Sequence, residues 1–264
     1  MMNIIRADVY RIVRGKAIYI TFTVLLALSL LEVFTFNGRG VSFGINTDVI
    51  DMTMGGQMNL DGVLAARLLL TTMDNLIYFI LPLFIAVAMS MFSSGAIKNE
   101  LASGIPRVRL YAAKWILSAI LCVLLMLTYV ACGAFAATVT RGLGRWSGAA
   151  LRSILTSCGA QMVLMLAFNS IGILLAFATR HSAAVNGAYI AFALVPTMVI
   201  ALFSNRYISF EKYYNYDLSL CMKLFSYVDK LPGTDIIRGL CIGTAYILVT
   251  TVLGITLFKR AEIK

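Results

Sequence analysis

Few residues in this chain have the types and spacing that catalysis or metal binding requires. Residues Gly40 to Gly44 read G-V-S-F-G, the pattern that surrounds many nucleophilic serines. Such a serine needs a base within hydrogen-bond reach, and we predict the only histidine, His181, on the opposite side of a membrane. The five cysteines form no C-x-x-C pair, so zinc ligands are also scarce. We therefore expect no catalytic residue and no metal site.

The sequence also lacks the complete phosphate-binding loop that nucleotide hydrolysis requires. Gly15 and Lys16 resemble the end of a phosphate-binding loop, but Ala17 stands where Ser or Thr must bind magnesium. Tyr10 stands where the first glycine of that loop belongs. We expect that the chain is not an enzyme and binds no cofactor itself.

The charged segment over Ser93–Lys114 is more informative, because it joins two apolar runs with far more residues than a turn needs. Gly104 and Pro106 interrupt it, which predicts a short helix, a turn and a second helix that enters the next apolar run. A charged segment of this kind can dock into a groove on a soluble partner. The alternative is a solvated loop without a partner, and the residues alone do not decide between the two.

The composition identifies the elements that must position these residues. Of the 264 residues, 60% are hydrophobic and 13% are charged, against roughly 25% charged in a soluble domain. We predict one all-α integral membrane domain over residues 1–264. The net charge of +10 is explained by basic residues kept at the cytoplasmic face rather than by nucleic-acid binding.

Six apolar runs are long enough to cross a bilayer as helices. Pro82 and Pro196 lie inside two of them and predict kinks. Val63–Met73, late in the first long loop, is apolar enough to form a helix that runs into the second span. The predicted spans are Ala17–Phe36, Leu76–Phe92, Trp115–Val139, a helix within Leu151–Ala178, Ala183–Phe203 and Gly239–Phe258.

The N-terminal segment Met1–Lys16 has the pattern of an amphipathic helix lying in the membrane interface. Its apolar residues share one side of a helical wheel and its arginines lie opposite or on the flank, near anionic headgroups. The alternative is an ordinary basic flank of the first span. The density of Lys and Arg predicts that both termini are cytoplasmic, with the loops Asn37–Asn75 and Ser204–Ile237 outside.

Polar residues within the spans are few. Glu32 is the only acid, and it lies about a turn from the end of its span, where headgroups or water could reach it. Gln161, Asn169 and Asn186 are explained by hydrogen bonds between helices. These four residues are also the candidates for a substrate path.

The charged segment resembles the permeases of the ABC-2 type, the membrane subunits of many ABC exporters. The chain is similar to that family in its six spans, its N-terminal helix and its basic tail. The long first loop departs from compact members and resembles small bacterial permeases of lantibiotic immunity, bacitracin resistance or amphipathic-peptide export. The matching positions are Gly95, Lys98, Asn99, Leu101, Gly104, Arg107, Tyr111 and Lys114, and Glu100 lies between Asn99 and Leu101 in the same segment.

The resemblance implies that these positions, Leu101 apart, form a cytoplasmic coupling helix between spans two and three that contacts an ATPase subunit. It implies two ATPase subunits that bind ATP and magnesium, and a second permease, identical or paralogous. An antimicrobial or other amphipathic peptide would then be exported across a bacterial plasma membrane. The alternative is a membrane scaffold or sensor subunit that transports nothing.

Overall fold

The computed structural model describes residues 2–35, 60–93, 95–144, 147–204, 213, 216–226 and 231–260. Gly40 to Gly44, most of the first predicted outer loop and parts of the second lie outside these ranges. Within the described residues, six helices are long and apolar enough to cross a membrane, which identifies a multi-pass membrane protein. Their number and order agree with the prediction. They are Lys16–Phe34, Met73–Phe92, Arg107–Arg141, Gly148–Thr179, Ser182–Ser204 and Gly233–Arg260.

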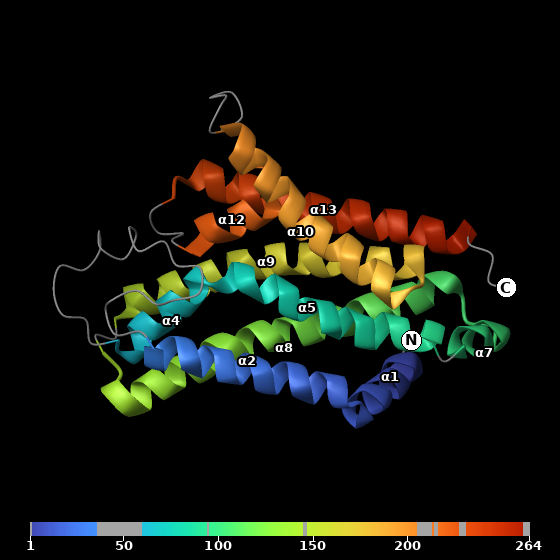
Figure 1. The fold of residues 1–264 in the computed structure, drawn as a ribbon, viewed down its shortest axis with the longest axis horizontal. Helices are drawn as coiled ribbons and strands as arrows, with labels where there is room; N and C mark the ends of the chain where they lie inside the picture. Colours follow the sequence, from blue (N-terminus) through green and yellow to red (C-terminus); the bar gives the residue numbers. More distant parts are fainter. Residues whose placement is uncertain are drawn as a thin grey trace.

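The chain begins with two helices that meet at one residue. Helix α1 (Met2–Arg14) is followed by Gly15 and then by α2 (Lys16–Thr35), the first span. Gly15 donates its N–H to the carbonyl of Ile12 at 2.9 Å, which ends α1. Figure 1 shows α1 turned away from the axis of α2.

The second span is broken into short helices. Helix α4 (Gly62–Thr71) precedes it, and the span itself runs through η1 (Met73–Leu76), α5 (Ile77–Phe84), the π-helical turn η2 (Ile85–Met89) and α6 (Ser90–Ser93). Pro82 lies inside α5 and, because it has no N–H, removes one helical hydrogen bond just before η2. The prediction of a helix over Val63–Met73 is confirmed up to Thr71.

Helix α4 belongs to the bundle rather than to an external loop. Leu68, Leu69 and Leu70 are buried. A methyl group added to Gly133 of the third span would meet Leu69 within 2.3 Å, so the two helices are in close contact. The C-terminal part of the predicted loop Asn37–Asn75 is therefore a helix packed within the bundle.

The predicted helix, turn and helix between spans two and three are confirmed. Helix α7 (Ala96–Ala102) is followed by a turn in which Gly104 has φ +82°, and α8 (Arg107–Arg141) then forms the third span. At 1.5 Å per residue, α8 is roughly 50 Å long, whereas a bilayer's hydrocarbon core is about 30 Å thick. Its ends therefore extend beyond the apolar layer.

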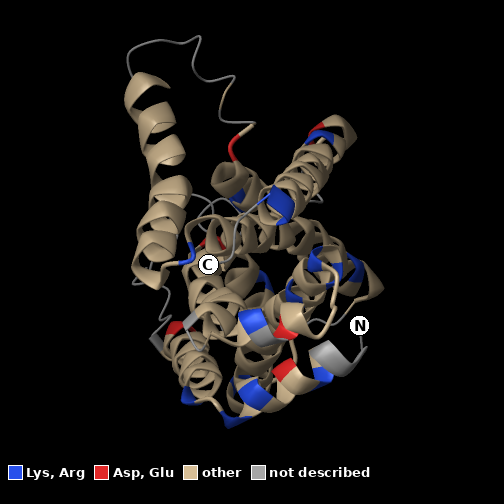
Figure 2. Ribbon diagram, turned by 90° about the vertical axis from the view of Figure 1, so that its right-hand side faces the viewer, with Lys and Arg blue, Asp and Glu red and all other residues tan. Residues whose placement is uncertain are grey.

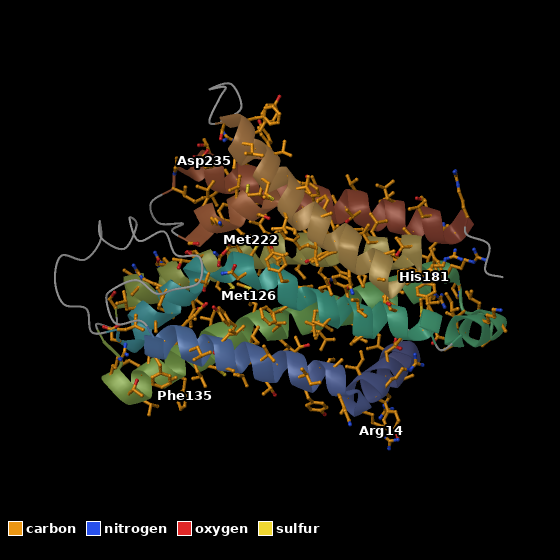
Figure 3. All side chains as sticks on the ribbon, in the orientation of Figure 1. Arg14, Met126, Phe135, His181, Met222 and Asp235 are labelled. Atoms are coloured by element: carbon orange, nitrogen blue, oxygen red, sulfur yellow. The ribbon has the colours of Figure 1, made fainter. Side chains whose placement is uncertain are left out.

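The remaining helices build the other side of the bundle. They are α9 (Gly148–Thr179), α10 (Ser182–Ser204), α12 (Leu218–Leu224) and α13 (Gly233–Arg260). Figure 1 shows α9 between α5 and α8 on one side and α10 and α13 on the other. Much of the bundle's outer surface is apolar, including Phe135 at 71% exposure, which points outward in Figure 3. Lipid is the solvent that suits such a surface.

Cys221 differs from what its sequence context predicts. The polar residues around it predict a loop, but it lies in α12 with 3% of its surface exposed. Burial raises the pKa of its thiol to about 11. The aromatic residues around α12 made this segment resemble an external loop, whereas it folds back onto the bundle.

Candidate functional site

A binding site for a charged or soluble partner is best sought where charged residues gather, and in this structure that is one end of the bundle. There α1, α7, the start of α8 and the end of α13 come together, as Figure 2 shows in a view onto that end. These four elements are distant in sequence. We refer to them below as the charged end.

A buried ion pair attaches α1 to α8. Lys114 Nζ lies 2.6 Å from Asp8 Oδ1, and the two side chains are 0% and 4% exposed. Ile12 on the next turn of α1 packs with Val87 and Leu117. An ion pair without access to water requires such close geometry, because both charges lose their hydration. The pair therefore fixes the position of α1 against the third span.

Sequence reasoning missed Asp8, although a signal was present. Asp8 follows Ile5 by three residues and precedes Ile12 by four, so all three share one side of a helix. A carboxylate on that side requires a buried cation or hydrogen-bond donors. Lys114 was assigned to the surface because it precedes the third span, but it has no exposed surface.

Helix α7 carries charged residues at the charged end and is anchored there by Ile97, which is 4% exposed. Lys98 is exposed on it, and Gly95 and Gly104 bound it with φ of +66° and +82°. Glu100 Oε1 lies 3.9 Å from Arg11 Nη2, so α7 also approaches α1. The side chain of Asn99 lies outside the described residues.

Arg107 and Tyr111 hold α8 against the last span. Arg107 Nη1 donates to the carbonyls of Phe258 at 3.1 Å and Lys259 at 2.9 Å, at the end of α13. Tyr111 has no exposed surface and packs on Phe177 with ring centroids 4.8 Å apart. The positions that resemble the permease motif thus divide into an exposed group on α7 and an internal group on α8.

The polar residues within the spans make separate contacts. Gln161 Nε2 donates to the carbonyls of Leu70 at 2.8 Å and Met222 at 3.1 Å. Asn169 Oδ1 accepts from Ser118 Oγ. In the described part of the chain, the Oδ1 atom of Asn186 is buried without a hydrogen-bond partner. The contacts of Gln161 and Asn169 fit the interpretation of helix-to-helix hydrogen bonds, whereas Asn186 Oδ1 makes none within the described residues.

Glu32 is enclosed by two hydroxyl groups. Its Oε2 atom accepts from Tyr129 at 2.5 Å and from Thr72 at 3.1 Å. The sequence indicated only that this carboxyl could reach headgroups or water, because its partners are 40 and 97 residues away. Among the described residues, no hydrogen bond joins any two of Glu32, Gln161, Asn169 and Asn186, so the four do not form one cluster.

Comparisons with known proteins identify no relative. No protein-family model matches the sequence, and no curated protein matches it. Within the described residues, no group of His, Cys, Asp and Glu side chains could hold a metal ion. Function must therefore be argued from the charged end and from the spans themselves.

Proposed function

We propose that this chain is the permease subunit of an ATP-driven exporter of the ABC-2 type. The observation that carries the proposal is α7, a short additional helix with the charged residues Lys98 and Glu100, held by two glycine turns between the second and third spans. A span-to-span connection needs only a few residues, as Arg180 and His181 show between α9 and α10. The additional helix is explained by contact with a soluble subunit.

The internal residues at the start of α8 would transmit a movement of α7 to the spans. Helix α7 is joined to α8 by the turn at Gly104, and α8 is one continuous helix of 35 residues. Arg107, Tyr111 and Lys114 tie the first turns of α8 to α13, α9 and α1. A displacement of α7 by an ATPase would therefore move several spans together.

The assembly that we propose contains two ATPase subunits, which bind ATP and magnesium, and a second permease, identical or paralogous. The substrate is an antimicrobial or amphipathic peptide that leaves the bacterial plasma membrane. The apolar outer surface of the bundle offers such a molecule access from the lipid. Glu32, Gln161, Asn169 and Asn186 stay candidates for its path.

Charge changes on α7 test this proposal. Lys98→Glu should leave expression and membrane insertion intact, because exposed charges contribute only about 0–1 kcal/mol to stability. Glu100→Lys should do so too, because the partly buried Glu100 loses only its 3.9 Å ion pair with Arg11. They should reduce co-purification of a nucleotide-binding partner subunit, since removing a charge from a desolvated contact costs about 2 kcal/mol or more. Arg107 is unsuitable for this test because it also holds α13.

Arg152→Glu provides the matched control, because Arg152 is exposed on α9, far along the chain from α7. It should leave co-purification and transport unchanged. If both α7 variants assemble and transport like the unaltered protein, α7 is a solvated connection. If no nucleotide-binding protein co-purifies at all, the scaffold or sensor role replaces the exporter.

The orientation that we propose places both termini and α7 in the cytoplasm, following the density of basic residues. With the native cysteines removed, an impermeant thiol reagent applied from outside should label Tyr216→Cys and spare Lys98→Cys. Both positions are exposed in the structure. Labelling of position 98 alone would invert the topology and separate α7 from any cytoplasmic ATPase.

A further inference from the structure

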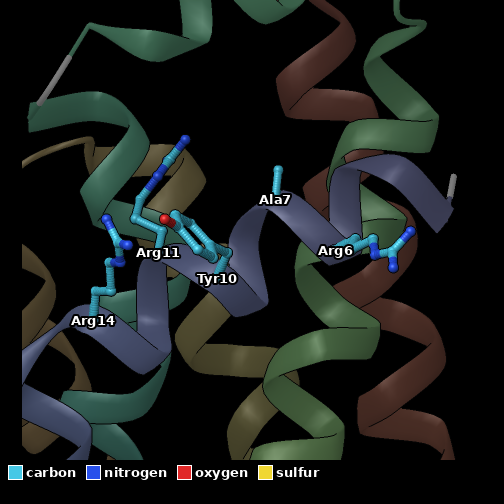
Figure 4. A pocket seen from close by; sticks show the side chains of 5 residues that line it. All are labelled: Arg6, Ala7, Tyr10, Arg11 and Arg14. Atoms are coloured by element: carbon cyan, nitrogen blue, oxygen red, sulfur yellow. The ribbon is translucent and has the colours of Figure 1, made fainter.

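The outward side of α1 carries an open hollow whose lining is basic and aromatic. Arg6, Ala7, Tyr10, Arg11 and Arg14 enclose about 670 Å³, and Figure 4 shows their side chains along one side of the helix. Ala7 has the shortest of these side chains, so it leaves space between the arginines. Helix α1 thus presents a concave, cationic surface away from the bundle.

The course of the chain fixes where this hollow lies. Only Gly15 separates α1 from α2, and the apolar span of α2 begins at Lys16. Helix α1 must therefore lie at the surface of the membrane. Val9 and Val13 are 41% and 54% exposed beside the arginines, and apolar residues in this position enter the acyl boundary while arginines remain at headgroup depth.

Two of the three arginines around the hollow, Arg6 and Arg14, are not neutralised within the described part of the chain. Among the described residues, no carboxylate forms an ion pair with Arg6 or Arg14, and Asp8 is held by Lys114 on the opposite side of α1. The Arg14 guanidinium lies 4.3 Å from the centre of the Tyr10 ring. This stacking orients the guanidinium and leaves its N–H groups available to bind oxygen atoms, for which phosphate has the matching geometry.

We propose that the hollow on α1 binds the phosphate of an anionic phospholipid, and that occupancy competes with the contact between α1 and α7. The proposal rests on membrane insertion alone and does not require an ATPase partner. Arg11 provides the competition because it belongs to both places. It lines the hollow, while its guanidinium lies 3.9 Å from Asp8 Oδ1 and 3.9 Å from Glu100 Oε1.

These two ion-pair distances are long for a charge-assisted hydrogen bond, which is about 2.7–2.9 Å. A phosphate that reaches Arg11 at hydrogen-bond distance would therefore draw it away from Glu100. The lipid composition of the surrounding leaflet would in this way set how firmly α7 is held by the bundle. An anionic lipid would loosen the contact between Arg11 and Glu100, and its absence would restore that contact.

The test measures the thermal unfolding midpoint of the purified full chain in detergent micelles that contain increasing fractions of phosphatidylglycerol or phosphatidylcholine. A ligand that binds the folded state raises the midpoint according to its affinity. Phosphatidylglycerol should act at lower fractions than phosphatidylcholine. Arg6→Gln combined with Arg14→Gln should weaken the apparent affinity for phosphatidylglycerol roughly tenfold or more, because each cation near an anionic surface contributes about fivefold.

Two exposed cations at the end of α13 provide the control. Lys259→Gln combined with Arg260→Gln removes the same charge from the same end of the bundle, and it should change the affinity by less than about twofold. Equal loss in both double variants would show diffuse attraction without a site and overturn the proposal. Equal action of the two lipids, or the same stabilisation by inorganic phosphate alone, would also overturn it.

Two further variants complete the test. Arg6→Lys combined with Arg14→Lys keeps both charges and should retain most of the preference for phosphatidylglycerol, which shows that a loss in the Gln variant is not a folding defect. Glu100→Gln should raise the affinity about twofold to threefold by releasing Arg11. An affinity that Glu100→Gln leaves unchanged would refute the competition between lipid and α7.

Discussion

Two acids enclosed by the helices, Asp8 and Glu32, are held in different ways. Asp8 faces the ammonium group of Lys114 at 2.6 Å, and neither side chain has contact with water. Glu32 faces two hydroxyl groups, and within the described residues no Lys or Arg lies within 4.0 Å of its carboxyl. One carboxylate is neutralised by an opposite charge, and the other is only hydrogen-bonded.

This difference separates a structural contact from a position that can change state. An ammonium group supports only the ionised form of Asp8, so the pair fixes α1 in one place. A hydroxyl group can donate to a carboxylate or accept from a carboxylic acid, so Tyr129 and Thr72 suit both forms of Glu32. Asp8 is therefore suited to anchoring and Glu32 to the proposed substrate path.

The largest expected effect comes from Lys114→Met. It leaves the Asp8 carboxylate buried without its cation, which should reduce the free energy of unfolding by about 3–5 kcal/mol. Combining Lys114→Met with Asp8→Asn should recover much of that loss. The measurement is denaturant unfolding of the purified chain, and Lys98→Met on exposed α7 is the control, expected within about 0.5 kcal/mol of the unaltered protein.

A small effect of Lys114→Met would contradict the anchoring role. It would show that Asp8 is already neutral or that water enters the contact. Full recovery in the double variant would show instead that the pair adds no stability beyond what uncharged groups provide. Either result would remove the distinction between the two acids.

An intermediate effect is expected at Glu32. Glu32→Gln keeps an oxygen that accepts from Tyr129 and Thr72, so it should change the free energy of unfolding by about 1 kcal/mol or less. Tyr129→Phe removes a donor and should cost about 1–3 kcal/mol. If Glu32→Gln proves as costly as Lys114→Met, then Glu32 carries a charge whose partner lies outside the described residues.

Measurements of peptide export should also distinguish the roles of Glu32 and Asp8. If Glu32 belongs to a substrate path, Glu32→Gln should reduce export of an amphipathic peptide while stability is retained. Asp8→Asn should reduce export only to the extent that it reduces folded protein. Parallel measurements of folded protein in the membrane and of peptide release distinguish these outcomes.

The sequence predicted the features that depend on residues close together in the chain. The six spans follow from apolar runs, and α7 with its turn follows from Gly104 and Pro106. The Asp8–Lys114 contact joins residues 106 positions apart, and Arg107 meets the carbonyl of Phe258 across 151 positions. No periodicity within a segment contains that information, because it depends on how the helices are rotated against one another.

The wrong predictions for Lys114 and for the α12 segment have the same cause, because both depend on contacts between distant segments. Lys114 stands at the edge of an apolar run, where a basic residue usually faces water, so only the position of α1 shows that it is buried. Segment α12 has the composition of a loop, yet Gln161 on α9 binds its Met222 carbonyl and draws it into the bundle. A buried glutamine in a span was the available signal, because its amide requires partners from another element.

The smallest expected effect concerns Arg11 and Glu100, and it tests whether Lys114 alone holds Asp8. Arg11 lies 3.9 Å from both Asp8 and Glu100, and its side chain is 40% exposed. Ion pairs this long and this accessible to water contribute about 0–1 kcal/mol. A double-mutant cycle of Arg11→Gln and Glu100→Gln should therefore give a coupling energy below about 0.5 kcal/mol.

A coupling energy of 2 kcal/mol or more would mean that α7 is held firmly against α1, so that neither a phosphate group nor the proposed ATPase could displace it readily. A weak coupling leaves α7 attached to the bundle chiefly through α8, as a helix that contacts a partner while the Asp8–Lys114 pair keeps α1 in place.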